Sequence, residues 1–522
     1  MFPEKCIEDI NRVIEEQQSK RILFISDEKE NSNALYNALK EKNNKQVSLY
    51  AGEDITSSWD MIIISDFYVV KDVLFINTLK ELLQYINHSL LVISGTYLDK
   101  NGDITNCTGT RFLHPVRFCE FDFSYQTYEA EGIWSIYNFY PTEVMLTERT
   151  VLKENIRNEN KKLNVLYALP HRLLTGGVKC LLTHARRLYR RGHNVYLMHS
   201  GHKTAIPEWS DVIEGEDITG QIVAVDARET AYDILYNKKI DVIIVGYYTQ
   251  IEQFIDLKLP ILYWEQGHEE LYGDFRAIES YNNPKRIGIR SKYQLPVSIA
   301  AVSPFLSAIL KARFGCNASL LHTGIDTDVY HPCAEKSLLN SQNPKILLVG
   351  NPFLPFKNFS YLLTALSYIW KKGYRFTVTW ACQSEPEVVV PFPIEYKVQV
   401  PQSELAELYR IHDIYINTSI YEASPMPPLE AMASGTAVIA TDCGGIHTYA
   451  IPGENMILTE QGNFNDLLAA IIYLLENPSA REVLAEKGRR TALEFSVGKA
   501  IDQLENLLYH TIEEHYRLNK EM

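Results

Sequence analysis

The stretch from Ile414 to Gly445, IYINTSIYEASPMPPLEAMASGTAVIATDCGG, constrains the fold of this chain more than any other. An apolar run at its start is typical of a strand, and a loop with Glu422 follows. The next segment begins at a pair of prolines and ends at Gly435, as a helix does. Residues 437–440 are again apolar. The stretch therefore predicts a strand-loop-helix-strand unit of a parallel α/β sheet.

Two carboxylates lie on either side of the predicted helix start. Glu430 falls in the first helical turn, where the helix dipole favours a negative charge, and seven residues separate it from Glu422. Free N–H groups at such a helix start can also hold an anion, although the prolines remove some of these donors. Two glutamates alone are more typical of an ordinary acidic residue at a helix start than of a binding site. A functional interpretation of the two glutamates depends on the residues around them.

The whole pattern, Glu422, Glu430 and the following AMASGTAVIATDCGG, resembles the signature of the retaining family 4 glycosyltransferases. This resemblance implies an α/β GT-B fold, in which two Rossmann-like lobes surround a donor cleft. It also implies that Glu430 hydrogen-bonds the ribose hydroxyls of a nucleotide-sugar donor. Glu422 would lie beside the donor sugar and its phosphates. The loop at Ser424, Pro425 and Met426 would contact the diphosphate.

A glycine pair, Gly176 and Gly177, stands between a predicted strand at 164–170 and a predicted helix at 179–190. Glycines in a turn before a helix let the backbone approach an anion at the helix N-terminus. Two glycines are a weak signal by themselves. Family 4 enzymes carry such a loop facing the donor phosphates, so the resemblance implies that Gly176 and Gly177 bind the donor.

The predicted strand at 345–350 ends in Gly350 and is followed by Asn351 and Lys357. In the family, this glycine is often followed by an arginine, and a lysine stands further on. The basic pair neutralises the departing diphosphate, and a lysine ammonium is adequate for phosphate. The resemblance implies that Lys357 is catalytic and that Gly350 and Asn351 bind the donor. Asn351 in place of arginine leaves three alternatives: weaker clamping, a different helper cation or lost activity.

His268 lies just past the predicted strand that begins at residue 261. Many family members carry a catalytic or substrate-orienting histidine at this position. The WEQGHE context, however, looks like the rhamnosyltransferase-like subset, in which no histidine is required. We therefore treat His268 as a candidate catalytic residue, with a structural role as the alternative.

At 522 residues the chain has the length of several domains. Strands and helices alternate near the N-terminus and predict a Rossmann-like unit with parallel strands. The first strand there is followed by ISDEKENSN, which lacks the glycine-rich loop of a methyltransferase. The expected division is an N-terminal accessory α/β domain (1–150), an acceptor-binding lobe (160–335), a donor-binding lobe (340–495) and a C-terminal crossover helix (496–522).

The net charge of −14 argues against a general attraction to nucleic acid. The eight cysteines are scattered, which favours reduced thiols and a cytoplasmic protein without a zinc site. No apolar run approaches the ~18 residues of a membrane span. Peripheral contact with the inner face of the membrane is a further expectation, with a solvated helix face as the alternative. It rests on four arginines at i,i+4 spacing, Arg186 with Arg190 and Arg187 with Arg191.

Taken together, these patterns predict a retaining hexosyl- or deoxyhexosyltransferase. It would move a sugar from a nucleotide-sugar donor to a glycan, lipid-linked or cell-surface polysaccharide acceptor, and it would require neither a cofactor nor a metal ion. Three alternatives stay open. They are a non-catalytic GT-B scaffold, a nucleotide-sugar epimerase or hydrolase, and a bifunctional enzyme in which residues 1–150 bind S-adenosylmethionine.

Overall fold

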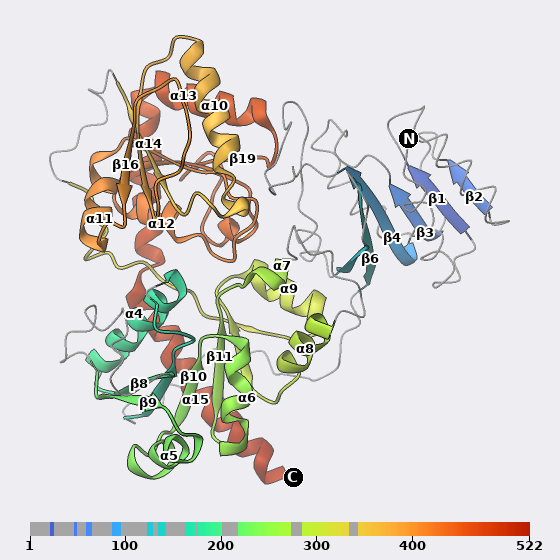
Figure 1. Ribbon diagram of the computed structural model, residues 1–522, viewed down its shortest axis with the longest axis vertical. Coiled ribbons are helices and arrows are strands. Elements are labelled where there is room, and N and C mark those ends of the chain that lie inside the picture. Colours follow the sequence, from blue (N-terminus) through green and yellow to red (C-terminus); the bar gives the residue numbers. More distant parts are fainter. Residues whose placement is uncertain are drawn as a thin grey trace.

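The computed structural model describes residues 162–173, 175–200, 218–272, 284–333 and 343–521, together with six strands nearer the N-terminus. These elements form three sheets (Figure 1). The helices predicted at 32–40 and 73–86 lie outside the described residues, as does most of the linker expected at 151–163.

The N-terminal sheet has the strand order β2-β1-β3-β4-β6-β5. Its strands are β1 (Arg21–Ile25), β2 (Gln46–Leu49), β3 (Trp59–Ile64), β4 (Ile86–Gly95), β5 (Phe123–Tyr128) and β6 (Trp134–Pro141). The first four are parallel to one another, whereas β6 pairs antiparallel with both β4 and β5. The parallel pairing predicted for this unit is therefore confirmed for β1 to β4, whereas the two antiparallel strands at its edge were not predicted. The aromatic residues of 121–140 favour strands, and they form two antiparallel neighbours.

The first lobe contains a seven-stranded sheet with the order β13-β12-β11-β10-β7-β8-β9, in which every pairing is parallel. Its strands are β7 (Asn164–Ala168), β8 (Asn194–Ser200), β9 (Gly220–Ala224), β10 (Val242–Val245), β11 (Ile261–Glu265), β12 (Ser298–Ala301) and β13 (Ser319–Leu320). Central strands such as β10, with the sequence VIIV, are buried throughout. Continuous apolar strands are expected where helices cover both faces of a parallel sheet.

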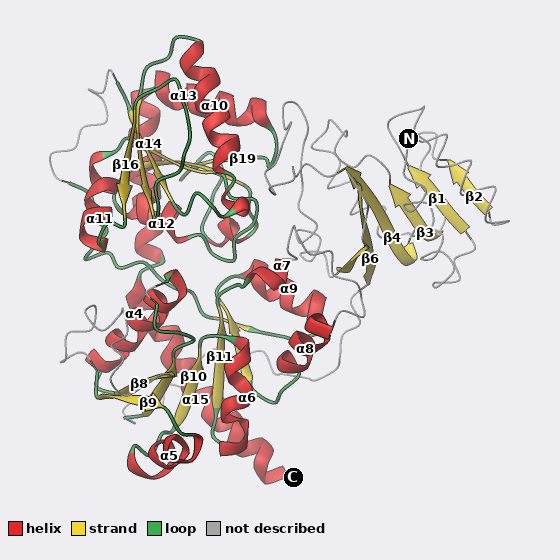
Figure 2. Ribbon diagram, in the orientation of Figure 1, coloured by secondary structure: helices red, strands yellow, loops and turns green. Residues whose placement is uncertain are grey.

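Helices of this lobe connect its strands and cover the sheet (Figure 2). They are α4 (Gly176–Arg190), α5 (Ala227–Tyr232), η3 (Asp233–Asn237), η4 (Tyr248–Gln250), α6 (Ile251–Phe254), η5 (Ile255–Leu257), α7 (Glu269–Tyr272), α8 (Pro284–Tyr293) and α9 (Pro304–Phe314).

The second lobe contains a six-stranded, fully parallel sheet with the order β16-β15-β14-β17-β18-β19. Its strands are β14 (Lys345–Val349), β15 (Thr377–Cys382), β16 (Ile394–Val398), β17 (Ile414–Asn417), β18 (Ala437–Thr441) and β19 (Ile457–Thr459). Its helices are η7 (Pro355–Lys357), α10 (Phe359–Lys371), α11 (Gln402–Ile411), α12 (Met426–Ala433), η8 (Gly445–Thr448), α13 (Phe464–Glu476) and α14 (Pro478–Glu494).

The last helix, α15 (Val497–Glu521), follows α14 of the second lobe but runs along the first lobe (Figure 1). Ile501, Leu504 and Leu508 are buried in the core of the first lobe. The chain therefore crosses back after the second lobe. Two parallel-sheet lobes joined in this way are the architecture expected for a GT-B protein. Among the described helices, none is long and apolar enough to cross a membrane.

Candidate active site

The stretch 414–445 folds as predicted, with β17 and β18 parallel and α12 between them. Gly435 follows α12 with a φ of +73°, a conformation that favours glycine. Glu422 lies in the loop after β17, where its backbone bridges to the loop after β18. Its N–H donates to Cys443 O at 3.0 Å, and its carbonyl accepts from Gly445 N at 3.0 Å. The sheet thus fixes the backbone from which the Glu422 side chain extends.

Glu422 forms an ion pair with Lys357, the last residue of η7. Lys357 Nζ lies 2.9 Å from Glu422 Oε1, and the two side chains are 15% and 14% exposed. Ser419 Oγ donates to the same carboxylate oxygen at 2.5 Å. The two loops follow β17 and β14, which are neighbours in the sheet. The structure therefore brings together two of the residues that were predicted to be catalytic.

Glu430 is partly buried on α12. Tyr409 OH donates to its Oε2 at 2.8 Å, and the hydroxyl of Tyr330 is close enough to lower its pKa. Burial raises the pKa of Glu430 above its usual value, whereas the two tyrosine hydroxyls and the positive charges of Lys179 and Lys357 lower it. Lys357 therefore acts electrostatically on both carboxylates of the motif.

Gly176 and Gly177 do not form the turn predicted before a helix, because they are the first two residues of α4. The helix continues across them since its apolar face packs into the lobe core through Val178, Leu181 and Leu182. A Cβ at position 177 would lie 3.4 Å from Gln266 Oε1. The first-turn N–H groups of a helix have no intrahelical acceptor. The start of α4 therefore offers backbone N–H groups without intrahelical acceptors, which is the feature on which the prediction of anion binding at these glycines rests.

Gly350 and Asn351 follow β14. Gly350 has a φ of +144°, and a Cβ there would lie 3.1 Å from the Phe359 ring. Asn351 Oδ1 accepts a hydrogen bond from Phe353 N at 3.0 Å, as in an Asx turn. Asn351 therefore stabilises the loop that leads to Lys357. An arginine in its place has no side-chain oxygen to accept the hydrogen bond from Phe353 N.

The segment Ser424, Pro425 and Met426 leads into α12. Tyr449 OH donates to the carbonyl of Pro425, and Thr323 Oγ1 lies 2.9 Å from Met426 Sδ. Ser424 is partly exposed at the loop between β17 and α12. The predicted diphosphate loop is thus anchored from both η8 and the segment that joins the lobes.

The two lobes touch at the loop that carries Glu422. Ser303, which caps α9 of the first lobe, donates from its Oγ to Ala423 O. Tyr272 of the first lobe stacks on Tyr421 of the second, with ring centroids 4.4 Å apart and an interplanar angle of 19°. Tyr421 and Ala423 belong to the core of the first lobe. Contacts between the lobes therefore hold the residues on either side of Glu422.

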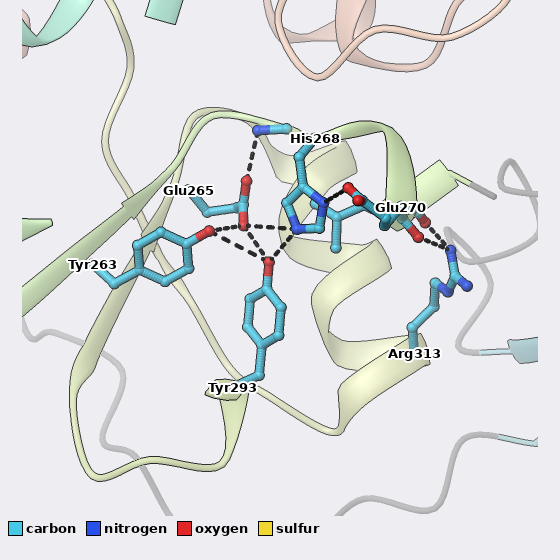
Figure 3. Close-up of polar contacts among 8 residues, drawn as sticks. Tyr263, Glu265, His268, Glu270, Tyr293 and Arg313 are labelled. Carbon is cyan, nitrogen blue, oxygen red and sulfur yellow. Dashed lines mark hydrogen bonds and ion pairs between the residues drawn. The ribbon is translucent and has the colours of Figure 1, made fainter. Parts of the chain in front are cut away.

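His268 lies in a buried polar network of the first lobe (Figure 3). Its Nδ1 lies 2.8 Å from Glu270 Oε2, and its Nε2 lies 2.9 Å from Tyr293 OH. Tyr293 and Tyr263 both donate to Glu265, a carboxylate that is 2% exposed. Both ring nitrogens of His268 are thus occupied by side chains of its own lobe.

The carboxylate Glu265 also accepts a hydrogen bond from Gly267 N at 2.7 Å. A Cβ at Gly267 would lie 2.6 Å from Ala423 Cβ of the second lobe. The network around His268 therefore fixes a loop that touches the Glu422 loop, although no contact described in the structure joins His268 to Glu422 or Glu430.

Three of the four arginines predicted to form a positive stripe are on α4, and Arg191 follows the helix directly. Arg187 Nη2 lies 2.9 Å from Asp326 and 3.1 Å from Asp328. Arg191 just after the helix pairs with Asp502 at 2.7 Å and with Glu505. Arg186 and Arg190 also have interaction partners within the chain. Carboxylates of the same chain therefore neutralise the positive charge of Arg187 and Arg191. The charge of these two arginines no longer supports the expected membrane contact.

Several residues near the two glutamates were not predicted. Ser419 was identifiable in principle, because it lies three residues before Glu422 in the same loop. Tyr330, Tyr409 and Lys179 carried no local signal, because they approach Glu430 from three separate elements. Among the described residues, no group of histidine, cysteine, aspartate and glutamate side chains could hold a metal ion.

Residues 393–491, which include both glutamates, match the sequence profile of the family described as glycosyl transferases group 1. The MMP alpha-(1->4)-mannosyltransferase of Mycolicibacterium hassiacum is 26% identical over 223 residues, covering 40% of this chain and 52% of that protein. The D-inositol 3-phosphate glycosyltransferase of Geodermatophilus obscurus is 37% identical over 100 residues, covering 19% of this chain and 22% of that protein. The chain thus spans about half the length, or less, of these curated relatives.

Solved structures resemble both lobes together. Sucrose-phosphate synthase from Thermosynechococcus elongatus has a TM-score of 0.56 and 17% identity, covering 68% of this chain and 100% of that chain. Anabaena HepE in complex with UDP and glucose has a TM-score of 0.54 and 15% identity, covering 66% of this chain and 99% of that chain. These likenesses confirm the predicted fold class. The chain has an α/β GT-B fold, and its second lobe is similar to the group 1 glycosyltransferases.

Proposed function

We propose that this protein is a retaining glycosyltransferase that moves a sugar from a nucleotide-sugar donor to an acceptor hydroxyl. The observation that carries the proposal is the grouping of Glu422, Lys357 and Glu430 beyond the carboxyl ends of β14 and β17. Ligands bind at this edge in parallel α/β sheets. The match of residues 393–491 to group 1 glycosyltransferases gives independent support.

The donor is a nucleotide sugar in this proposal. Anabaena HepE, which shares the fold, has been solved with UDP and with UDP-glucose. Glu430 would accept hydrogen bonds from the ribose hydroxyls, because a carboxylate is an acceptor for two donors at once. The loop Ser424, Pro425 and Met426 and the start of α4 at Gly176 and Gly177 would take the diphosphate between them.

Departure of a nucleoside diphosphate develops negative charge on the leaving oxygen. Lys357 and the N-terminal ends of α4 and α12 would meet this charge with groups that are already in place, which is the most effective form of electrostatic catalysis. A diphosphate would compete with Glu422 for the Lys357 ammonium, and the Ser419 hydroxyl would remain on the carboxylate. Glu422 would then orient the hydroxyls of the donor sugar.

Retention of the anomeric configuration follows in this proposal from departure and attack on the same face of the sugar. His268 then acts as a positioning residue, because Glu270 and Tyr293 occupy its two ring nitrogens. It would hold the loop at Gly267 against Ala423 beside the donor sugar. The acceptor, a glycan or a lipid-linked or cell-surface polysaccharide, would enter from the first lobe.

One observation favours a second candidate, a nucleotide-binding scaffold without transferase activity. Asn351 stands where relatives often carry a second diphosphate-binding cation, and its side chain is used in a turn. A nucleotide-sugar hydrolase or epimerase would use the same donor site with no acceptor.

Release of nucleoside diphosphate from a panel of UDP-, GDP-, ADP- and TDP-sugars tests the proposal, with Lys357→Met as the matched inactive control. Sugar transfer to an added glycan or polyprenyl phosphate, dependent on Lys357, is the expected result. Release of free sugar whatever acceptor is added would identify a hydrolase. Nucleotide binding without turnover of any donor would identify the scaffold.

A further inference from the structure

Two tyrosines from separate elements hold the carboxylate of Glu430. Tyr409 on α11 donates from its hydroxyl to Glu430 Oε2 at 2.8 Å. The hydroxyl of Tyr330, in the segment that joins the lobes, also acts on the same side chain and lowers its pKa. The two rings also pack on each other edge to face, with centroids 5.9 Å apart and an interplanar angle of 70°. We call Tyr330 and Tyr409 the tyrosine pair.

The tyrosine pair is buried, with Tyr409 0% and Tyr330 3% exposed. A buried hydroxyl is costly unless it finds an acceptor, and Glu430 supplies one to Tyr409. Burial and the nearby charge of Glu430 raise the pKa of both phenols. The pair therefore stays protonated and can donate to the carboxylate.

Opposing effects act on the ionisation of Glu430. Burial favours its neutral form and raises its pKa, whereas the hydroxyls of Tyr409 and Tyr330 favour the charged form and lower its pKa. An ionised carboxylate offers acceptor sites on both oxygens and makes stronger hydrogen bonds than a neutral carboxyl group. The protonation state of Glu430 therefore decides how well it can accept hydrogen bonds from a ligand.

We propose that Tyr330 and Tyr409 are positioning residues for donor binding, which orient Glu430 and keep it in the ionised form that accepts the ribose hydroxyls of the donor. This inference rests on the proposed function. Tyr330 also ties donor binding to the segment between the lobes, because its backbone N–H donates to Asp326 O at 2.9 Å in that segment.

Other groups also lie near Glu430. Lys179 on α4 and Lys357 on η7 both stabilise its carboxylate. Burial and, to a lesser extent, Glu430 raise the pKa of Cys180 on α4, Tyr415 on β17 and Tyr449 after η8, so these three stay neutral at low and neutral pH. Two further carboxylates are close, because Glu422 pairs with Lys357 and Asp326 acts on Tyr330. A background that carries Glu430→Gln is therefore needed to assign a pH-dependent change in donor binding to Glu430 itself.

Removal of a tyrosine hydroxyl removes a group that lowers the pKa of Glu430. The pKa of Glu430 then rises further, so the carboxylate becomes protonated at a higher pH than in the wild type. Donor binding that needs the ionised form is lost earlier as the pH falls. The acid limb of kcat/KM for the donor moves to higher pH.

The experiment compares Tyr409→Phe and Tyr330→Phe with the wild type in donor turnover across the acid range. The expected result is an upward shift of the acid limb, with KM for the donor about tenfold higher at the acid end and kcat little changed. Tyr374→Phe is the matched control. It removes a tyrosine hydroxyl that donates to Glu476 Oε1 at 2.7 Å on the surface of the same lobe. We expect it to keep the wild-type profile.

A double-mutant cycle with Glu430→Gln separates this role from a general effect on packing. The amide does not titrate, so Tyr409→Phe should change donor KM by less than about twofold in that background. Wild-type pH profiles in both tyrosine variants would overturn the inference. An equal loss of affinity with and without Glu430→Gln would also overturn it, because the effect would then not pass through Glu430.

A readout without donor keeps the two proposals distinguishable. The infrared carboxyl band that is absent from Glu430→Gln reports protonation of Glu430 in the protein alone. In the tyrosine variants this band should appear at higher pH. If the wild type turns over a donor and the band titrates unchanged in the variants, the inference fails and the proposed function stands. If the band shifts and no nucleotide binds, the ionisation role stands and the proposed function fails.

Discussion

Lys357→Met removes the cation that pairs with Glu422 and leaves a largely buried carboxylate with only the Ser419 hydroxyl from this cluster. At the 2.9 Å separation of the pair, two unit charges attract by about 6 kcal/mol at an effective dielectric constant of ~20. The cost of removing both charges from water offsets much of this attraction. Because loss of one partner of a buried pair costs about 3–5 kcal/mol and these side chains keep some exposure, we expect the free energy of unfolding to fall by about 2–3 kcal/mol.

The same substitution has a separate effect on catalysis. A preorganised charge that meets the leaving group contributes about 3–4 kcal/mol, so turnover of the donor should fall about 100- to 1,000-fold. The double variant Lys357→Met/Glu422→Gln distinguishes the two effects. Removing the unpaired carboxylate charge should restore much of the lost stability, whereas it cannot restore the missing cation, and turnover should stay low.

Urea unfolding and nucleoside diphosphate release measure the two quantities on the same four proteins, the wild type, both single variants and the double variant. The reasoning would be refuted by a double variant that is less stable than Lys357→Met. It would equally be refuted by a Lys357→Met protein with near-normal turnover, because the ion pair would then be only structural.

Three further predictions concern the fold around the site. Gly444→Ala should destabilise by about 2–4 kcal/mol in urea, because φ is +80° and the new Cβ would lie 2.4 Å from an aromatic ring carbon of the first lobe. Gly453→Ala, with a φ of +76° and nothing within 4 Å, should cost only about 1 kcal/mol and isolates the backbone contribution. Burial lowers the pKa of His184 from 6.5 to about 4, so the unfolded state takes up its proton first as the pH falls. The free energy of unfolding should drop by about 3 kcal/mol as the pH falls from 6.5 to about 4. In His184→Gln the free energy of unfolding, measured by urea titration at several pH values, should depend less on pH. Arg191→Gln should lower the free energy of unfolding by about 0.5–1 kcal/mol at low salt, because its partly exposed pair with Glu505 is lost. The effect should be smaller in about 1 M NaCl, where charges are screened.

The parts of the fold that could be predicted from the sequence are those with local signals. In α13, for example, a continuous amphipathic pattern ends at Asn477 and Pro478. The unit at 414–445 carries a proline start, a glycine stop and two apolar strands within one short stretch. Such signals do not depend on the rest of the chain.

Predictions failed where packing outweighs local preference. Gly176 and Gly177 suggested a turn, yet tertiary contacts of α4 extend the helix over both. The aromatic residues of β5 and β6 were not predicted to form strands, yet these strands pair with each other and β6 pairs with β4. In each case the local sequence is compatible with more than one form, and contacts with distant segments decide which is adopted.

The composition of the site was predictable only in part for a related reason. Glu422, Glu430 and Lys357 belong to a family pattern that can be read along the chain. Tyr330 and Tyr409 approach Glu430 from the segment between the lobes and from α11. Which residues meet there depends on the order of strands in the sheet, and neither tyrosine differs by sequence context from an ordinary core residue.

Calorimetric binding of nucleoside diphosphates to the wild type and to Glu430→Ala tests whether Glu430 holds the ribose of a nucleotide donor. We expect that one of UDP, GDP, ADP and TDP binds the wild type at micromolar concentration. Loss of the carboxylate that accepts the ribose hydroxyls should weaken this binding at least tenfold, at about 1.5–3 kcal/mol for hydrogen bonds to a charged group. Absence of binding by all four at millimolar concentration, or equal binding by Glu430→Ala, would contradict it.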